Sequence, residues 1–214
     1  GLSGLVVDRF ADILVVQIST AGMERVKNEI VEALQDVLKP SAILMKNDGK
    51  MRQIEGLETY VEEAFGTVPE LVFLQEIGVL FQAPVWDGQK TGWFYDHREN
   101  RKTMQGYCAG KRVLDVFSYI GGWGVQAASA GATDVTFIDA SESALSHVDE
   151  NLKLNQYEGG SNLMHGDAFE AMQSLIEDKE RFDVVVMDPP AFIARRKDIK
   201  AGEGAYHRAN QLAM

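Results

Sequence analysis

Apolar and polar positions in the second half of the chain alternate between the spacing of strands and the spacing of helices. Short apolar runs rich in β-branched residues predict strands at 111–119, 134–140, 161–166 (the weakest) and 182–188. Helical spacing follows at 124–130, 142–154 and 168–180, and begins again at 206–214. Because strands that alternate with such helices form βαβ units, the pattern predicts an α/β fold with a parallel, Rossmann-like sheet.

The first part of the chain has a different pattern. Residues 5–19 predict a hairpin, and apolar positions at helical spacing over 24–38 predict an amphipathic helix that Pro40 ends. A strand at 41–46 and a second hairpin at 71–86, with Gly78 near its bend, complete the predicted elements. We therefore expect a small α+β domain over 1–80, suited to packing or docking, before an α/β domain over 81–214. Four strands are few for a doubly wound sheet, so the second domain is expected to be C-terminally incomplete.

Composition narrows the class of protein. The 214 residues are 45% hydrophobic and 25% charged, which is ordinary globular composition. No apolar run approaches the length of a membrane span, and no signal peptide is visible at the N-terminus. The single cysteine, Cys108, suits a reducing compartment, so we expect a cytoplasmic protein with no membrane partner.

Charge gives one local signal. The net charge of −11 excludes a nucleic-acid module that binds by bulk positive charge. A short basic cluster nevertheless stands out, with only Asp198 as an acid among its members, Arg195, Arg196, Lys197 and Lys200. Two interpretations stay open, a solvated loop and a loop that faces phosphates.

Glycines follow the first strand of the predicted sheet. Gly121, Gly122 and Gly124 lie at the strand-to-helix turn, where a backbone without side chains can approach a ligand closely. The dinucleotide fingerprint G-x-G-x-x-G is not met, because Trp123 stands where its second glycine belongs. A pyrophosphate site is therefore disfavoured, and simple helix–strand packing remains an alternative reason for the glycines.

Acids stand at the tips of the other three strands. Asp139 comes 18 residues after Gly121 (139 − 121), a spacing suited to binding both hydroxyls of a ribose. Asp167 follows the third strand and can accept a hydrogen bond from the amine of an adenine. Helix capping is the alternative role for both acids.

The fourth strand ends in Asp188-Pro189-Pro190. In open parallel sheets, ligands bind at the carboxyl ends of strands. The glycine turn and the three strand-tip acids together predict a ligand that carries adenosine but no pyrophosphate. S-adenosylmethionine (SAM) meets that description, whereas a nicotinamide dehydrogenase is disfavoured by Trp123.

The order of these features is similar to that of class I SAM-dependent methyltransferases. The usual first motif, an acid followed by three alternating glycines, is reduced here to Asp115 and Gly121. The stretches FSYIGG, DASESAL, GDAF and FDVVVMDPPAF resemble a narrower group, the bacterial 23S ribosomal RNA large subunit methyltransferase I family, which forms 5-methylcytosine. QKTGWFYDHREN and VVDRFADILVVQISTAG resemble the same family, so the resemblance covers nearly the whole chain.

The resemblance implies a site and a set of partners. Asp188, Pro189 and Pro190 would face the target base of 23S ribosomal RNA. Lys90 and Thr91, with Asp96 and Arg98, would close the cofactor pocket. The remaining cofactor residues would line the methionine end, the ribose and the adenine, in chain order Phe117, Ser118, Tyr119, Gly121, Gly122, Asp139, Ala140, Asp167 and Ala168. The family also has an N-terminal PUA domain and a longer C-terminal part, so we expect this chain to be a fragment.

The implied reaction needs a thiolate, which adds at carbon 6 of cytosine and makes carbon 5 nucleophilic. Cys108 lies before the first strand and is expected to be a buried hydrophobe. The resemblance places the nucleophilic cysteine beyond Met214. The four histidines have no metal-ligand spacing, so no metal is expected. Trp123, Phe192 and Tyr206 are candidates for stacking on a base, although helix packing is the favoured role of Trp123.

Two other functions stay open at this stage. A guanine-N7 ribosomal methyltransferase relative also has a glycine turn and a DPP-x-F segment. A non-catalytic RNA-binding or assembly factor could keep the fold without methyl transfer. The sequence is compatible with a homodimer and does not identify the modified nucleotide.

Overall fold

The computed structural model describes residues 1–193 and 195–214, and the chain forms two compact units. The first unit comprises Gly1–Gln75 and Phe81–Tyr95, and the second comprises Glu76–Leu80 and Asp96–Met214. The predicted boundary after residue 80 falls inside a hairpin that the two units share.

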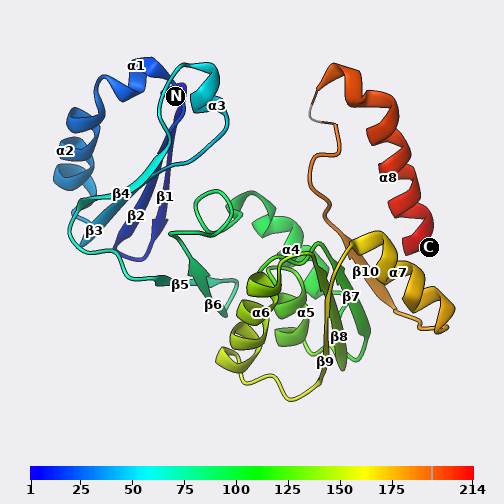
Figure 1. Cartoon of the computed structure of the whole chain (residues 1–214). Helices are drawn as coiled ribbons and strands as arrows, with labels where there is room; N and C mark the ends of the chain where they lie inside the picture. The colour runs from blue at the N-terminus through cyan, green and yellow to red at the C-terminus, as the bar shows by residue number, and fades with distance from the viewer. Residues whose placement is uncertain (194) are drawn as a thin grey trace. The chain divides into compact units, whose positions relative to one another are not determined.

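The first unit contains a four-stranded sheet of order β1-β2-β3-β4, seen in Figure 1 with α2 across one face. The predicted hairpin is confirmed, because β1 and β2 pair antiparallel, and β3 pairs parallel to β2. β4, antiparallel to β3, was not predicted, because its two adjacent glutamates interrupt the alternation of apolar residues. The bounds are β1 Leu5–Phe10, β2 Ile13–Ile18, β3 Ala42–Asn47 and β4 Tyr60–Phe65.

Helices in this unit follow the predicted pattern with one correction. The helix expected over 24–38 is two helices, α1 (Ala21–Glu24) and α2 (Lys27–Leu38), followed by the left-handed Lys39. A further short helix, α3 (Met51–Ile54), precedes β4. Apolar side chains of α2 cover the core of the sheet, and they are Ile30, Val31, Leu34 and Leu38.

The second predicted hairpin is also confirmed. β5 (Leu71–Glu76) and β6 (Val79–Pro84) pair with each other, and the two residues between them are Ile77 and Gly78. Both of these residues have left-handed backbones, with φ of 53° and 81°. Two such residues in a two-residue loop match the right-handed twist of a hairpin.

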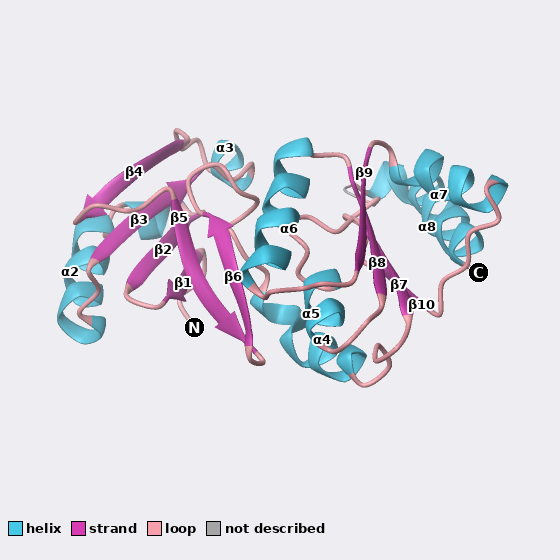
Figure 2. Cartoon of the chain, turned by 90° about the horizontal axis from the view of Figure 1, so that it is seen from below, coloured by secondary structure: helices cyan, strands magenta, loops and turns pink. Residues whose placement is uncertain are grey.

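The second unit is built on a four-stranded parallel sheet of order β10-β7-β8-β9. All four predicted strands are present, and the register places Leu114 opposite Thr136 on one side and Val185 on the other. Figure 2 shows α4, α5 and α6 on one face of this sheet and α7 and α8 on the other. The strands are β7 Arg112–Val116, β8 Asp134–Asp139, β9 Gly160–His165 and β10 Val184–Met187.

Helices connect these strands as the sequence predicted. α6 has the predicted bounds, Glu142–Leu154, and Ser141 caps it by accepting a hydrogen bond from the Ala144 N–H at 3.2 Å. α8 begins earlier than the pattern at 206–214 indicated. The other elements are η1 Tyr95–His97, α4 Arg98–Gln105, α5 Gly124–Ser129, α7 Ala168–Glu177, η2 Arg196–Asp198 and α8 Ile199–Ala213.

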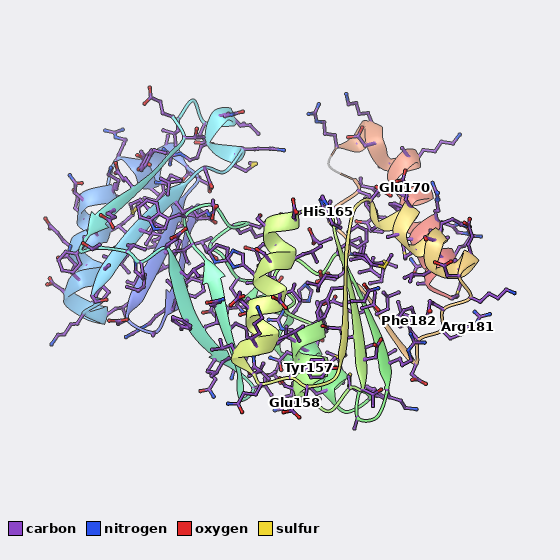
Figure 3. The ribbon with its side chains drawn as sticks, turned by 60° about the horizontal axis from the view of Figure 1, so that its bottom comes forward. Tyr157, Glu158, His165, Glu170, Arg181 and Phe182 are labelled. Atoms are coloured by element: carbon purple, nitrogen blue, oxygen red, sulfur yellow. The ribbon has the colours of Figure 1, made fainter. Side chains whose placement is uncertain are left out.

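Parallel pairing brings all four carboxyl ends to one edge of the sheet. Figure 3 shows His165, the last residue of β9, at this edge, together with Glu170 near the start of α7. Tyr157, Glu158, Arg181 and Phe182 precede β9 and β10, and they lie at the opposite edge. The strand-tip acids of the sequence analysis therefore belong to one edge. No helix in the described part of the chain is long and apolar enough to cross a membrane.

Candidate functional site at the carboxyl edge of the parallel sheet

The loop that follows β7 has an unusual backbone. β7 ends at Val116, three residues before the predicted end of the strand, because Phe117 turns left-handed with φ of 64°. Tyr119 and Gly121 are also left-handed, with φ of 49° and 84°. Non-glycine residues in this region are strained and cluster at functional sites. At Gly121 a side chain is excluded, since a Cβ would lie 2.8 Å from Val125 Cγ2.

Asp139 ties this loop to the tip of β8. Its Oδ2 accepts a hydrogen bond from the Tyr119 N–H at 2.7 Å, and its Oδ1 accepts one from the Ser141 N–H at 2.8 Å. The side chain of Ser141, not that of Asp139, caps α6. Each carboxylate oxygen keeps a second lone pair, so Asp139 can still accept hydrogen bonds from a ligand.

Asp115 lies fully buried beneath the same loop. Its Oδ2 accepts a hydrogen bond from the Gly124 N–H at 2.7 Å, whereas its Oδ1 has no partner. Burial raises the pKa of this carboxyl from 3.8 to about 7, and the hydrogen bond from Gly124 acts in the opposite direction. The negative charges of Asp188 and Asp139 raise the pKa further.

Asp167 adopts the capping role that the sequence left open. Its Oδ1 accepts hydrogen bonds from the N–H groups of Phe169 and Glu170, at 2.9 and 3.2 Å, at the start of α7. Ala168 is buried against the core, and the Ala140 carbonyl lies 3.1 Å from His165 Nε2. Capping uses Oδ1 and not Oδ2, so Asp167 can still accept a hydrogen bond from an adenine amine. This role stays a prediction.

Asp188 has two neighbours that sequence reasoning did not assign to it. The indole Nε1–H of Trp123 donates a hydrogen bond to Asp188 Oδ2 at 2.9 Å. His97 Nε2 lies 3.6 Å from the same oxygen, and 3.9 Å from Asp96 Oδ2. Pro189 and Pro190 follow directly. The sequence favoured helix packing for Trp123 and gave His97 no role, since neither spacing nor composition reveals a contact across the sheet edge.

Lys90 and Thr91 belong to the first unit and have partners there. Thr91 is buried, and its hydroxyl donates to Asp8 Oδ2 at 2.6 Å. The Lys90 ammonium lies 4.3 Å from the centroid of the Phe94 ring. In the second unit, Asp96 and Arg98 are exposed. The role of these four residues in closing a cofactor pocket stays a prediction.

Aromatic side chains gather after the DPP segment. Phe192 packs against Phe117, Phe169 and Tyr206, with ring centroids at 6.1, 5.9 and 4.8 Å. The Phe192 N–H also donates a hydrogen bond to the Tyr206 hydroxyl at 3.2 Å. Two of the candidates for stacking on a base, Phe192 and Tyr206, are therefore packed against each other, and Phe192 also contacts Phe117 of the β7 loop.

The basic cluster and Cys108 lie apart from these groups. Arg195, Arg196, Lys197 and Lys200 are all exposed, at η2 and the start of α8. Cys108 is fully buried, and burial raises the pKa of its thiol. It is thus an inert core residue, as the sequence predicted. The described residues contain no group of three or more His, Cys, Asp or Glu side chains placed to hold a metal ion.

The residues at this edge fit an adenosine-bearing cofactor with a polar tail. Two buried polar atoms beside the β7 loop have no hydrogen-bond partner, Asp115 Oδ1 and Ser118 Oγ. Buried polar atoms are almost always satisfied, so such orphans indicate a missing ligand or water. Asp139 adds acceptor capacity at the next strand, as a ribose requires.

Comparison with known proteins agrees with this geometry. Residues 57–200 match the family model described as S-adenosylmethionine-dependent methyltransferase. The chain is 40% identical over 213 residues to the protein named "Putative ribosomal RNA large subunit methyltransferase MJ1653" of Methanocaldococcus jannaschii, covering 99% of this chain and 54% of the relative. It is 35% identical over 216 residues to ribosomal RNA large subunit methyltransferase I of Aeromonas salmonicida, covering 100% of this chain and 54% of that protein.

Solved structures share the fold. The structure of SMU.776, described as a "putative methyltransferase complexed with SAH", superposes with a TM-score of 0.82 at 24% identity, over 98% of this chain and 55% of that one. The tRNA m1G37 methyltransferase of M. jannaschii superposes with a TM-score of 0.71 at 18% identity, over 99% of this chain and 60% of that one. The chain spans about half the length of the curated relatives it matches.

Proposed function

Because the chain belongs to the family of S-adenosylmethionine-dependent methyltransferases, we propose that its full-length protein methylates large-subunit ribosomal RNA, at carbon 5 of a cytosine. One observation carries the proposal. The Asp188 carboxylate, held by Trp123, stands at the same sheet edge as the loop that Asp139 anchors. Asp188, the proposed contact to the base, and Asp139, the proposed contact to the cofactor, thus lie at one edge, where ligands of parallel sheets bind.

The cofactor side of the proposal rests on the β7 loop and Asp139. SAM supplies an electrophilic methyl group when it is bound. Phe117, Ser118 and Tyr119 would hold its methionine end together with Gly121 and Gly122. Asp139 would accept hydrogen bonds from the ribose hydroxyls, with Ala140 beside it, and Asp167 and Ala168 would border the adenine.

The base side of the proposal rests on Asp188. A carboxylate accepts a hydrogen bond from an exocyclic amine such as that of cytosine, and the two prolines that follow limit the freedom of the backbone. A base must leave its stack to reach the site, which is least costly in a loop. Carbon 5 becomes nucleophilic only when a thiolate adds at carbon 6, and a base must then remove the carbon-5 proton so that the thiolate leaves. Cys108 is too buried for this role, so the proposal requires a cysteine elsewhere in the full-length protein, which the resemblance places after residue 214.

The proposed function is tested by the chemical identity of the product. Full-length protein is incubated with SAM and unmodified large-subunit RNA, and the RNA is digested and analysed by mass spectrometry. We expect 5-methylcytidine. If 7-methylguanosine forms instead, the cytosine assignment is wrong, and RNA binding without any methylated product would identify a non-catalytic factor.

Substitution of Asp139 tests the cofactor side. Asp139→Ala is expected to weaken SAM binding by about 1–3 kcal/mol, or roughly 5- to 150-fold in Kd, because hydrogen bonds to a charged acceptor are lost. Isothermal titration calorimetry measures the change. Asp149→Ala is the matched control, since Asp149 lies on α6 and pairs with Lys153 at 2.7 Å. Equal affinities for wild type and Asp139→Ala would remove the ribose role.

Neutralising the basic cluster tests the RNA side. If Arg195, Arg196 and Lys197 contact phosphates, replacing all three by Ala lowers the slope of log K against log salt by about 0.7–0.9 per lost contact. RNA binding is measured across a salt series. The control replaces Lys111, Lys179 and Arg181, which precede β7 and β10 at the opposite sheet edge. An unchanged slope in the first variant would show that the cluster only solvates a loop.

A further inference from the structure

We propose that Trp123 and His97 are positioning residues that hold the Asp188 carboxylate in the orientation needed for methyl transfer. This inference rests on the proposed function, because it assigns Asp188 to the target base. All three side chains belong to the second unit. They come from three separate segments: η1, the turn before α5, and the end of β10.

Asp188 needs external support to keep one orientation. It follows β10 directly, and its side chain is 36% exposed. An exposed carboxylate on a strand tip samples several rotamers, and each fixed torsion costs conformational entropy. A carboxylate that must meet one face of a base is therefore more effective when neighbours fix it beforehand.

Trp123 provides the directional contact. An indole N–H can only donate a hydrogen bond. Trp123 is therefore the donor, and Asp188 Oδ2 the acceptor, of the 2.9 Å bond. A donor to a charged oxygen forms a stronger bond than a donor to a neutral one. The bond uses one lone pair of Oδ2, and no hydrogen bond to Oδ1 is found in the described part of the chain. Oδ1 therefore keeps the larger acceptor capacity for a base.

His97 provides the second contact on the same oxygen. Its Nε2 lies 3.6 Å from Asp188 Oδ2, and its ring lies 5.6 Å from the Trp123 ring, centroid to centroid. With 32% of its side chain exposed, His97 covers one side of the pair without closing it from solvent. His97 therefore contacts both the indole and the carboxylate that the indole holds.

A buried ion pair also lies beside the indole. Arg101 lies 5.8 Å from the Trp123 ring, and its guanidinium forms two hydrogen bonds with Glu76, at 2.6 and 2.8 Å. Both partners of this pair are only 2% exposed. Trp123 therefore lies close both to His97 and to a buried, ion-paired guanidinium, and these neighbours restrain the indole.

The first test separates turnover from binding. Trp123→Phe keeps an aromatic ring and removes only the donor, so we expect kcat of the full-length enzyme to fall about 10- to 100-fold. The Kd for SAM should stay within about twofold. Trp86→Phe is the matched control, because the Trp86 indole donates to the Val68 carbonyl within the first unit, and it should leave kcat unchanged. Unchanged kcat in Trp123→Phe would overturn the proposal.

The histidine is tested by rescue. His97→Ala should lower kcat about 3- to 10-fold, whereas His97→Gln, which keeps a polar side chain of similar reach beside Asp188, should recover part of the loss. A double-mutant cycle then shows whether both residues act through Asp188. In the Asp188→Ala background, which removes the acceptor, Trp123→Phe should have no further effect on the residual kcat. Additive losses would show that Trp123 acts elsewhere, and equal losses in His97→Ala and His97→Gln would exclude a role for the polar contact between His97 and Asp188.

A measurement without turnover separates this inference from the proposed function. The indole N–H resonance of Trp123 is identified by its loss in Trp123→Phe. In Asp188→Ala it should shift and exchange faster with solvent, because the acceptor is gone. No change in that resonance would refute the contact itself. A changed resonance with an active Asp188→Ala enzyme would instead refute the assignment of Asp188 to the base.

Discussion

Asp188→Ala in the full-length enzyme is expected to lower kcat by about 10²-fold or more, because the hydrogen bond that orients the target base is lost. The affinity for SAM should change by less than about twofold, because the proposed cofactor contacts are those of the β7 loop and Asp139. Asp188 receives the Trp123 hydrogen bond at 2.9 Å, so its removal leaves the indole N–H without an acceptor. Steady-state kinetics on RNA and calorimetry with SAM measure the two quantities separately.

Asp183→Ala is the matched control for this substitution. Asp183 immediately precedes β10, at the opposite end of the same strand, where it accepts a hydrogen bond from the Arg112 N–H at 2.9 Å. Its loss should cost some stability and leave kcat unchanged. If Asp188→Ala methylates RNA at the wild-type rate, Asp188 is not part of the site.

The second large effect concerns stability and pH. Asp115→Asn is expected to stabilise the fold more at high pH than at low pH. Its free energy of unfolding relative to wild type should be about 2–3 kcal/mol larger at pH 8 than at pH 5. The pKa of Asp115 rises from 3.8 to about 7 because the carboxyl is buried. Asparagine has the shape of the protonated acid, and its amide oxygen can accept the hydrogen bond from Gly124.

The sign follows from proton binding. Between pH 4 and pH 7 the folded protein keeps a proton on Asp115 that the unfolded chain has released. The native state therefore binds more protons, and the free energy of unfolding of the wild type falls as pH rises through this window. Well above pH 7 Asp115 is ionised in both the folded and the unfolded state. The loss of wild-type stability then levels off at roughly 4 kcal/mol, since one pKa unit corresponds to about 1.36 kcal/mol.

Urea unfolding at pH 5 and pH 8 measures this difference. The control, Asp36→Asn, changes an exposed acid on α2 and should alter stability by less than about 0.5 kcal/mol at either pH. An Asp115→Asn variant that is destabilised equally at both pH values would contradict the buried-acid explanation.

Elements of the second unit were predictable because local and global signals agree there. Apolar runs of four to seven residues, separated by helices of which α6 and α7 begin at a side-chain cap, leave few arrangements other than a parallel sheet. α6 illustrates the point, since Ser141 caps the helix that its apolar spacing predicts. β4 was missed because it is stabilised by pairing with β3 and its own sequence lacks alternation. The break between α1 and α2 was missed as well.

The candidate site was predictable only in part. Asp139, Asp167 and Asp188 follow strands, so the topology brings them to one edge of the sheet. Which of them caps a helix was open in the sequence, and the structure assigns capping to Asp167 and Ser141. His97 and Trp123 were not connected to Asp188, because 91 and 65 residues separate them from it (188 − 97 and 188 − 123).

The sequence by itself determined the βαβ rhythm, the strand-tip acids and the family. These follow from periodicity and from short motifs, which depend on neighbours in the chain. Tertiary structure alone decided the burial of Asp115, the left-handed β7 loop and the contacts of Trp123 and His97 with Asp188. The physical reason is that desolvation and hydrogen bonding act over a few ångströms of space, whatever the separation along the chain.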